Sequence, residues 1–251
     1  MVHSSSTQRC LVLFTKPPRP GRVKTRLIGR LSAAQAAALH AAFLADVLAR
    51  LRRGAFDLRL AWALAPGEAI PSPAELARAQ PTTPPADWQR LLAGIAHQRQ
   101  VGGDLGARLH HGLAAAGRRY RYVAAAGSDH PELPAARVDG AFARLEAGAE
   151  VVVGPAADGG YYLIGARREA LDPRLFAGVP WSSGAVLRTT LANAASLGLE
   201  VARLELGHDV DEPADLERLA ARLASGGRAS GACPHTRALL EAWGMLRAVP
   251  A

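Results

Sequence analysis

A short loop near the start of the chain gathers the positive charge needed to hold phosphate groups. Residues 15–27 read Thr-Lys-Pro-Pro-Arg-Pro-Gly-Arg-Val-Lys-Thr-Arg-Leu and place five cations within eleven residues. These cations are Lys16, Arg19, Arg22, Lys24 and Arg26. Gly21 allows the backbone to approach a ligand closely, and the prolines restrict the loop. The segment has the composition expected of a diphosphate or triphosphate site.

The lysines of this loop stand out because the chain otherwise uses arginine. Lys16 and Lys24 are the two lysines among 30 basic residues. An ammonium group is a compact point charge that suits a phosphate oxygen, and a helix beginning near Lys24 would add its free amides. We predict phosphate contacts from Lys16, Pro17, Gly21, Arg22, Lys24, Thr25 and Arg26, with Ser128 from a later loop.

The sequence of this loop matches neither of the two common nucleotide-binding motifs. A Walker A loop needs Gly-Lys-Ser/Thr in a row, but two residues separate Gly21 from Lys24. No GxGxxG follows the strand predicted over residues 9–15, so the dinucleotide fingerprint is missing as well. The alternative is a basic loop that is simply solvated.

Three aspartates follow predicted strands and are candidates for a metal site. Asp129 lies in Gly-Ser-Asp-His-Pro at 127–131, and Asp209 and Asp211 flank Val210 after the last predicted strand. Residues two apart in extended chain face the same way, so both later carboxylates can face one ion. Oxygen ligands of this kind suit Mg²⁺ or Mn²⁺. The structural alternatives are a turn or helix cap for Asp129 and a cap before Pro213 for Asp211.

Other residues are candidates for lining a substrate pocket. Asp104 and Arg108 lie in a glycine-rich segment at a predicted helix start, where Asp104 also suits a plain N-cap. Tyr161 follows Asp158, Gly159 and Gly160, which equally suit a hairpin turn. Trp181 and Ser182 are further candidates, although a tryptophan is commonly a core residue. No HExxH, Ser-His-Asp or GxSxG pattern occurs in the chain.

Apolar periodicity predicts an alternation of strands and helices. We expect strands at 9–15, 57–65, 121–126, 150–154, 161–166 and 200–206. We expect helices at 33–53, 104–117, 134–148, 184–197 and 213–224, and a loop with at most one short helix at 66–86. The order predicts a three-layer α/β/α sandwich with a mostly parallel mixed sheet, in which ligands bind at the carboxyl ends of strands.

The chain length suits one large domain followed by a short tail. We predict a nucleotide-binding domain over residues 1–224 and a linker with a helical tail over 225–251. In that tail, Leu239, Trp243 and Leu246 lie on one helical face, which favours packing or a subunit contact such as a homodimer.

Composition excludes several classes of protein. The chain has 251 residues with 49% hydrophobic and 21% charged residues, which excludes a disordered chain. Cys10 and Cys233 are too few for a disulfide scaffold, and the apolar runs are too short to cross a bilayer. We expect a cytoplasmic protein without membrane contact. The net charge of +8 is compatible with nucleic acid, but the basic residues are scattered and no nucleic-acid motif occurs.

Together these segments resemble the nucleotide-diphospho-sugar transferase superfamily, whose fold is glycosyltransferase-A-like. The matching segments are 16–27, 100–108, 127–131, 154–165 and 209–216. The chain is most similar to the radical-SAM/selenodomain-associated transferases, and the first and last segments also resemble 2-phospho-L-lactate guanylyltransferase. The resemblance implies Mg²⁺ held by Asp129, Asp209 and Asp211, and triphosphate contacts from Lys16, Lys24 and Arg26. His130 is larger than the residue expected there.

These observations favour a metal-dependent nucleotidyltransferase. A small phosphorylated acceptor would attack a nucleoside triphosphate and release pyrophosphate, with Lys24, Asp129 and Asp211 as the catalytic residues. A glycosyltransferase that uses a nucleotide sugar is the first alternative. A nucleotide- or RNA-binding module without catalysis is the second.

Overall fold

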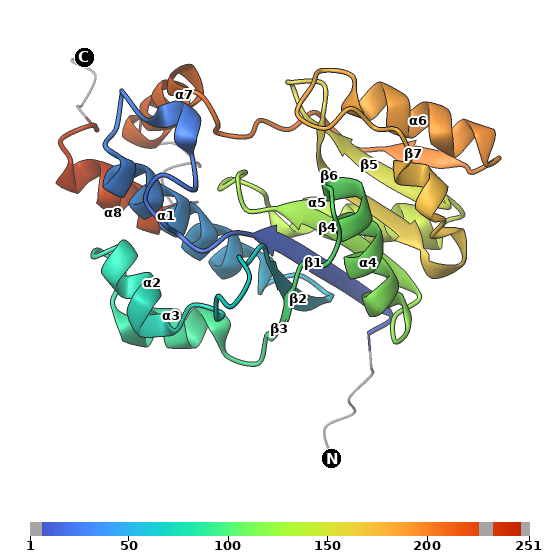
Figure 1. Cartoon of the computed structure of the whole chain (residues 1–251), viewed down its shortest axis with the longest axis horizontal. Coiled ribbons are helices and arrows are strands. Elements are labelled where there is room, and N and C mark those ends of the chain that lie inside the picture. Colours follow the sequence, from blue (N-terminus) through green and yellow to red (C-terminus); the bar gives the residue numbers. More distant parts are fainter. Residues whose placement is uncertain (1–6, 226–232, 247–251) are drawn as a thin grey trace.

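The computed structural model describes residues 7–225 and 233–246, and its centre is a seven-stranded sheet (Figure 1). The strand order is β3-β2-β1-β4-β6-β5-β7. Strand β6 pairs antiparallel with both β4 and β5, whereas the other neighbouring strands pair in parallel. The predicted mostly parallel mixed sheet is confirmed.

Helices connect most of the strands and lie on both sides of the sheet. The strands are β1 (Arg9–Thr15), β2 (Asp57–Trp62), β3 (Ala96–Arg99), β4 (Tyr122–Gly127), β5 (Val151–Pro155), β6 (Tyr161–Arg167) and β7 (Val201–Arg203). The α-helices are α1 (Ala33–Leu51), α2 (Pro73–Ala79), α3 (Pro85–Leu92), α4 (Leu105–Gly117), α5 (Ala135–Glu146), α6 (Val186–Ser196), α7 (Pro213–Ala224) and α8 (Pro234–Ala242). Short 3₁₀ helices are η1 (Thr25–Leu27), η2 (Arg168–Ala170) and η3 (Pro173–Phe176).

Alternating residues of the central strand β1 pack against helices on opposite faces. Leu11 and Leu13 belong to a core that contains side chains of α1 and α5. Val12 and Phe14 belong to a second core with side chains of α4 and η3. Because both faces are covered, β1 reads as a continuous apolar run rather than as an alternating one. The three-layer α/β/α arrangement predicted from the sequence is therefore confirmed.

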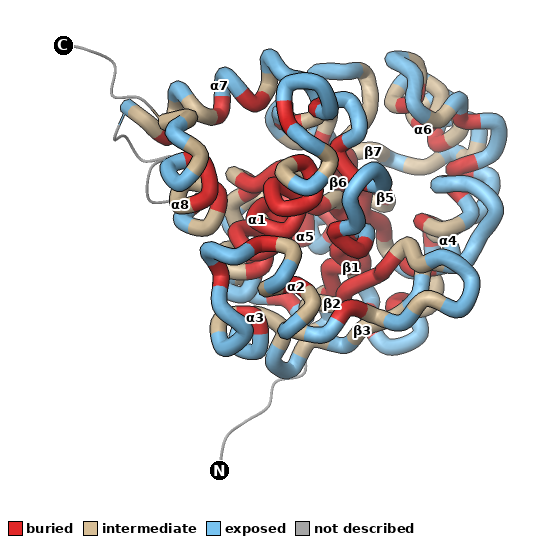
Figure 2. Tube along the Cα trace, turned by 60° about the vertical axis from the view of Figure 1, so that its left-hand side comes forward, coloured by how far each residue is buried: buried red, intermediate tan, exposed pale blue. Residues whose placement is uncertain are grey.

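Helix α1 lies between the sheet and the C-terminal helices α7 and α8. Ser32 accepts from the backbone N–H of Gln35, whose side chain accepts from the backbone N–H of Ser32, so a capping box starts the helix. By length and composition α1 is apolar enough to cross a membrane, but 78% of its apolar window is buried inside the protein. One side of α1 packs against the sheet, and the other side forms a third core with α7 and α8. Most of α1 is accordingly buried (Figure 2).

The segment between β2 and α4 differs from its prediction. Residues 66–86 contain helix α2 and the start of α3, and the short strand β3 follows where no strand was predicted. Strand β3 is an edge strand of four residues, Ala-His-Gln-Arg, and none of them is fully buried. A short polar edge strand carries little apolar pattern, which is why periodicity did not reveal it.

The predicted helix start near Lys24 is a single 3₁₀ turn, η1, rather than an α-helix. Lys24 precedes this turn in the left-handed conformation, with φ of 47°. A left-handed residue cannot continue a right-handed helix, so Lys24 separates the phosphate loop from the turn. The loop therefore leads into one 3₁₀ turn rather than into the first turn of an α-helix.

The C-terminal tail packs on the central helix. Helix α8 places Leu239 and Leu240 in the core with Leu39 and Phe43 of α1, and Trp243 packs at its edge. The predicted linker at 226–232 lies outside the described residues. The division of the chain at residue 225 stays a prediction.

The carboxylate of Asp46 holds α8 in place. Asp46 lies on α1, is fully buried, and accepts from the backbone N–H groups of His235 and Thr236 at 2.9 and 2.8 Å. These two amides belong to the first turn of α8, where N–H groups lack partners within the helix. Burial outweighs these hydrogen bonds and raises the pKa of Asp46 to about 7.

The raised pKa of Asp46 predicts that the stability of the fold depends on pH. Between pH 4 and 7 the folded protein holds a proton on Asp46 that the unfolded chain has lost. The free energy of unfolding therefore falls as pH rises through this window, by at most about 4 kcal/mol from this group.

An Asp46→Asn variant tests this expectation. Asparagine keeps one acceptor oxygen for α8, so the variant should cost about 1 kcal/mol at pH 4.5 and remain folded. Urea unfolding of both proteins between pH 4.5 and 7.5 should show a smaller loss of stability in the variant. Equal losses in the two proteins would contradict the assignment.

Candidate functional site

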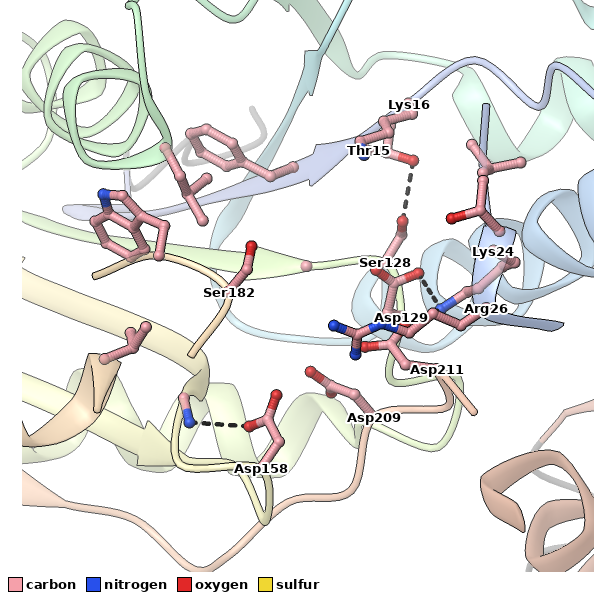
Figure 3. A pocket seen from close by; sticks show the side chains of 18 of the residues that line it. Thr15, Lys16, Lys24, Arg26, Ser128, Asp129, Asp158, Ser182, Asp209 and Asp211 are labelled. Atoms are coloured by element: carbon pink, nitrogen blue, oxygen red, sulfur yellow. Dashed lines mark hydrogen bonds and ion pairs between the residues drawn. The ribbon is translucent and has the colours of Figure 1, made fainter. Parts of the chain in front are cut away.

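A cavity of about 630 Å³ opens where the predicted site residues meet (Figure 3). Its walls come from the end of β1 and the following loop, the end of β4, the β5–β6 turn, the loop before α6 and the segment before α7. The sequence predicted ligand binding at the carboxyl ends of the strands, and the cavity lies at the carboxyl ends of β1 and β4.

Most predicted site residues line this cavity. They are Lys16, Arg22, Lys24, Thr25, Arg26, Arg108, Ser128, Asp129, Asp158, Gly160, Tyr161, Trp181, Ser182, Asp209 and Asp211. Pro17, Gly21, Asp104 and Gly159 are not part of the lining. The functional roles assigned to all of these residues stay predictions.

The predicted residues outside the lining shape its surroundings. Asp104 accepts from the backbone N–H of Ala107 at 2.7 Å, so it caps α4. Gly21 has a φ of 74°, which glycine adopts without strain. Arg19 donates to Glu68 at 3.0 Å, so this cation of the loop is directed to a partner outside the cavity.

Lys24 lines the cavity and binds two of the three aspartates. Its Nζ lies 2.5 Å from Oδ1 of Asp129 and 3.0 Å from Oδ1 of Asp211, and it donates to the carbonyl of Val210 at 2.7 Å. Burial alone would lower the pKa of Lys24, but the two carboxylates outweigh it and the pKa rises. Lys24 is therefore a charged counter-ion of the aspartates in this structure.

Asp129 is held between cationic and polar groups at the end of β4. Burial would raise its pKa, but the Lys24 ammonium and His40 hold the pKa well below its ordinary value. Nδ1 of His40 lies 3.6 Å from Oδ1 of Asp129. Asp129 therefore carries its negative charge throughout the neutral range.

Asp209 is the aspartate that Lys24 does not contact. Burial, followed by the charges of Asp129 and Asp211, raises its pKa to about 7. Nδ1 of His130 lies 3.7 Å away, but burial and Arg137 lower the pKa of His130 to about 4. His130 is thus neutral at pH 7 and leaves the charge of Asp209 uncompensated.

The turn that carries Asp158 is fixed by close backbone packing. Asp158 accepts from the backbone N–H of Gly160 at 2.9 Å. A Cβ on Gly159 would lie 2.3 Å from the carbonyl oxygen of Gly184, and the carbonyl of Gly159 accepts from the N–H of Leu187 at 2.9 Å. The β5–β6 turn is therefore locked to the start of α6, and Figure 3 shows Asp158 facing Asp209.

Strained backbone occurs at two places in the cavity wall. Lys24 and Ser182 are the non-glycine residues with positive φ in the described part of the chain, at 47° and 65°. Both line the cavity. Such conformations cost of order 1 kcal/mol and cluster at functional sites, because the surrounding structure must hold them.

Part of the cavity lining is apolar. Phe14, Leu105, Trp181 and Val186 line it. The ring of Tyr161 packs edge-on to Trp181, with ring centroids 6.4 Å apart. Burial raises the pKa of Tyr161 far above its ordinary value, so its hydroxyl stays protonated. This part offers aromatic and aliphatic surface rather than charge.

Sequence reasoning missed His40, Thr15 and Gln100, which also line the cavity. Nε2 of His40 donates to the carbonyl of Lys16 at 3.0 Å, and Oγ1 of Thr15 shares a 3.0 Å hydrogen bond with Ser128. Gln100 donates to the carbonyl of Thr15 at 3.2 Å. His40 is a polar residue within the apolar face of helix 33–53, and that position was the available signal.

The residues present fit a divalent cation that is also bound by phosphate oxygens. Within residues 7–225 and 233–246, no three His, Cys, Asp or Glu side chains converge on one metal position. Asp209 nevertheless presents an uncompensated carboxylate to the cavity. Mg²⁺ is commonly held by one or two carboxylates together with substrate phosphates, so this donor set is sufficient.

Comparison with known proteins identifies the superfamily. The model of a family of uncharacterized proteins conserved in bacteria (DUF2064) matches residues 65–183. A protein from Desulfovibrio desulfuricans G20, provisionally named a nucleotide-diphospho-sugar transferase, has a solved structure with 31% identity and a TM-score of 0.79. The match covers 96% of both chains. No curated protein matches the sequence.

More distant structures share the fold. A cytidylyltransferase from Leptospira borgpetersenii is 12% identical, with a TM-score of 0.56 over 98% of both chains. A nucleotidyl transferase from Methanothermobacter is 18% identical, with a TM-score of 0.52 over 86% of this chain and 98% of that chain. Similarity to radical-SAM-associated transferases and to 2-phospho-L-lactate guanylyltransferase stays a prediction. The 31% identity over nearly the whole length shows that the chain belongs to the nucleotide-diphospho-sugar transferase superfamily.

Proposed function

We propose that this protein is a metal-dependent nucleotidyltransferase that transfers a nucleoside monophosphate to a small phosphorylated acceptor. The observation that carries the proposal is the distribution of charge in the cavity. Lys16, Arg22 and Arg26 line it from the loop after β1, and Asp158 and Asp209 line it from two other segments. Cations suit a polyphosphate, and carboxylates suit the cation that accompanies it.

The proposed reaction is an in-line displacement at the α-phosphorus of a nucleoside triphosphate. A phosphate oxygen of the acceptor forms a bond to the α-phosphorus, and the bond to the β-phosphate oxygen breaks. The electron pair of the broken bond leaves with pyrophosphate. An acceptor phosphate dianion needs no base and the protein needs no nucleophile, so positioning and charge stabilisation suffice.

Each wall of the cavity has a part in this reaction. Lys16, Arg22 and Arg26 bind the β- and γ-phosphates and stabilise the negative charge of the leaving pyrophosphate. Asp209, with Asp129 and Asp211 beside it, would hold the metal ion. When bound, Mg²⁺ or Mn²⁺ neutralises charge on the phosphate oxygens. The apolar part around Tyr161 and Trp181 receives the non-phosphate part of the acceptor or the nucleoside.

The second candidate function is glycosyl transfer from a nucleotide-diphospho-sugar. The name of the Desulfovibrio relative, at 31% identity, favours it. In that reaction an acceptor oxygen would attack the sugar, and a nucleoside diphosphate would leave. The same cations would stabilise this leaving group, so the released product distinguishes the two reactions.

The first test is the identity of the leaving group. We expect the protein, given Mg²⁺, a nucleoside triphosphate and a phosphorylated acceptor, to release pyrophosphate. Screening the four ribonucleoside triphosphates against a panel of phosphorylated acceptors with a coupled pyrophosphate assay measures this. Release of nucleoside diphosphate from nucleotide sugars, without pyrophosphate from any triphosphate, would assign the glycosyl reaction instead.

The second prediction concerns Asp209. Asp209→Asn should lower kcat at least 100-fold, because it removes the uncompensated carboxylate that suits the metal. The melting temperature should be unchanged or slightly higher, because the substitution removes a partly exposed charge that Asp129 and Asp211 repel. The exposed Glu169→Gln is the control and should leave both values unchanged. A fully active Asp209→Asn variant would exclude the metal role.

The third prediction separates two arginines of the same loop. Arg22→Ala should raise the KM for the nucleotide about tenfold, because Arg22 lines the cavity and offers charge to the phosphates. Arg19→Ala is the matched control, since Arg19 pairs with Glu68 outside the cavity. Steady-state kinetics of both variants at constant ionic strength check this. An equal rise in KM for both would indicate general electrostatic attraction rather than a defined contact.

A further inference from the structure

We propose that Lys24 is a built-in counter-ion that prevents a divalent metal ion from binding to the aspartates until the nucleotide arrives. The inference rests on the proposed function and describes how that site is regulated. It gives Lys24 a role different from that of a phosphate ligand. Three observations carry it: the hydrogen-bond geometry of the ammonium group, its burial and the charge balance around it.

The ammonium group of Lys24 makes two hydrogen bonds and one further ion pair with protein atoms. An ammonium group has three N–H donors and no acceptor. Its three short contacts are Oδ1 of Asp129 at 2.5 Å, the carbonyl of Val210 at 2.7 Å and Oδ1 of Asp211 at 3.0 Å. A phosphate oxygen would have to compete with these contacts for the ammonium group.

The position of Lys24 is enforced by its surroundings. Its side chain is only 2% exposed, and its Nζ lies 5.4 Å from the centroid of the Phe43 ring. The residue also holds a left-handed backbone, with φ of 47°. A long flexible side chain would not be kept in such a strained, buried position unless tertiary contacts fixed both its ends.

The charge balance explains why a bare metal ion is excluded. The buried Lys24 ammonium lies against the partly exposed side chains of Asp129 and Asp211, so a divalent ion approaching these carboxylates meets a positive charge. Asp209 is left as a single carboxylate, and the described residues contain no group of three metal ligands. One carboxylate alone binds Mg²⁺ weakly, because this ion gives up its water reluctantly.

A nucleotide supplies what the free site lacks. Its phosphates bring oxygen ligands for the metal and negative charge that offsets the repulsion from Lys24. The metal therefore enters as a complex with the nucleotide rather than before it. Conversely, removing the charge of Lys24 leaves Asp129, Asp209 and Asp211 with excess negative charge, which favours a divalent ion even without nucleotide.

The experiment measures Mn²⁺ binding to the full chain without nucleotide, from the loss of the free Mn²⁺ signal in electron paramagnetic resonance. Lys24→Met should bind Mn²⁺ at least tenfold more tightly than the unmodified protein. Lys16→Met is the matched control, because Lys16 lines the same cavity but, within the described residues, makes no ion pair with these aspartates. It should bind as the unmodified protein does, and so should Lys24→Arg, which keeps the charge.

Melting temperatures cover the case in which Lys24→Met folds poorly. Mn²⁺ should raise the melting temperature of Lys24→Met, or restore its folding, while leaving the unmodified protein unchanged, because a ligand of the native state stabilises it. A double variant with Asp211→Asn should lose this effect. Equal Mn²⁺ affinity for the unmodified protein and Lys24→Met, or no Mn²⁺ effect on the stability of Lys24→Met, would overturn the proposal.

Failure of this inference is distinguishable from failure of the proposed function. The four nucleoside triphosphates with Mg²⁺ are tested on the unmodified protein by thermal shift, and the proposed function requires that at least one stabilises it. If one does and Lys24→Met gains no Mn²⁺ affinity, the inference is wrong and the function stands. If none does, the function fails regardless of how Lys24→Met behaves.

Discussion

The ion cluster of Lys24, Asp129 and Asp211 is the interaction on which the rest of the site depends. It joins the loop after β1 to the end of β4 and to the segment before α7, and Lys24 and Asp211 are 187 positions apart in the chain. The Lys24 ammonium is buried, and a buried charge without partners is costly, so Asp129 and Asp211 are needed to stabilise it. The cluster thereby fixes the phosphate loop against the acidic segments and determines where the cavity lies.

The sheet supports this cluster through contacts of small residues and hydroxyl groups. Thr15 at the end of β1 shares a hydrogen bond with Ser128 beyond β4, which places Asp129 next to the phosphate loop. Gly159 packs on the backbone of Gly184, which holds Asp158 opposite Asp209. The cavity therefore has rigid walls on both sides, as electrostatic stabilisation of a transferred phosphate requires.

The aspartates of the cavity differ in whether a cation pairs with them, and this difference bears on which of them can bind a ligand. Asp129 is paired and remains ionised, whereas burial and the charges of Asp129 and Asp211 raise the pKa of Asp209. A paired group maintains structure, and an unpaired one is available for a ligand. The two strained residues, Lys24 and Ser182, also line this cavity. Their backbone conformations lower the stability of the fold at the place where we propose that the ligand binds.

The sequence by itself determined the layers, the main helices and the segments that carry the site. Buried strands such as β1 have a continuous apolar pattern, and the caps Ser32 and Asp104 act locally, so neighbouring residues decide them. The polar edge strand β3 lacked this pattern and was missed. Only the tertiary structure decided that Lys24 pairs with Asp129 and Asp211, because these partners come from segments far apart in the chain.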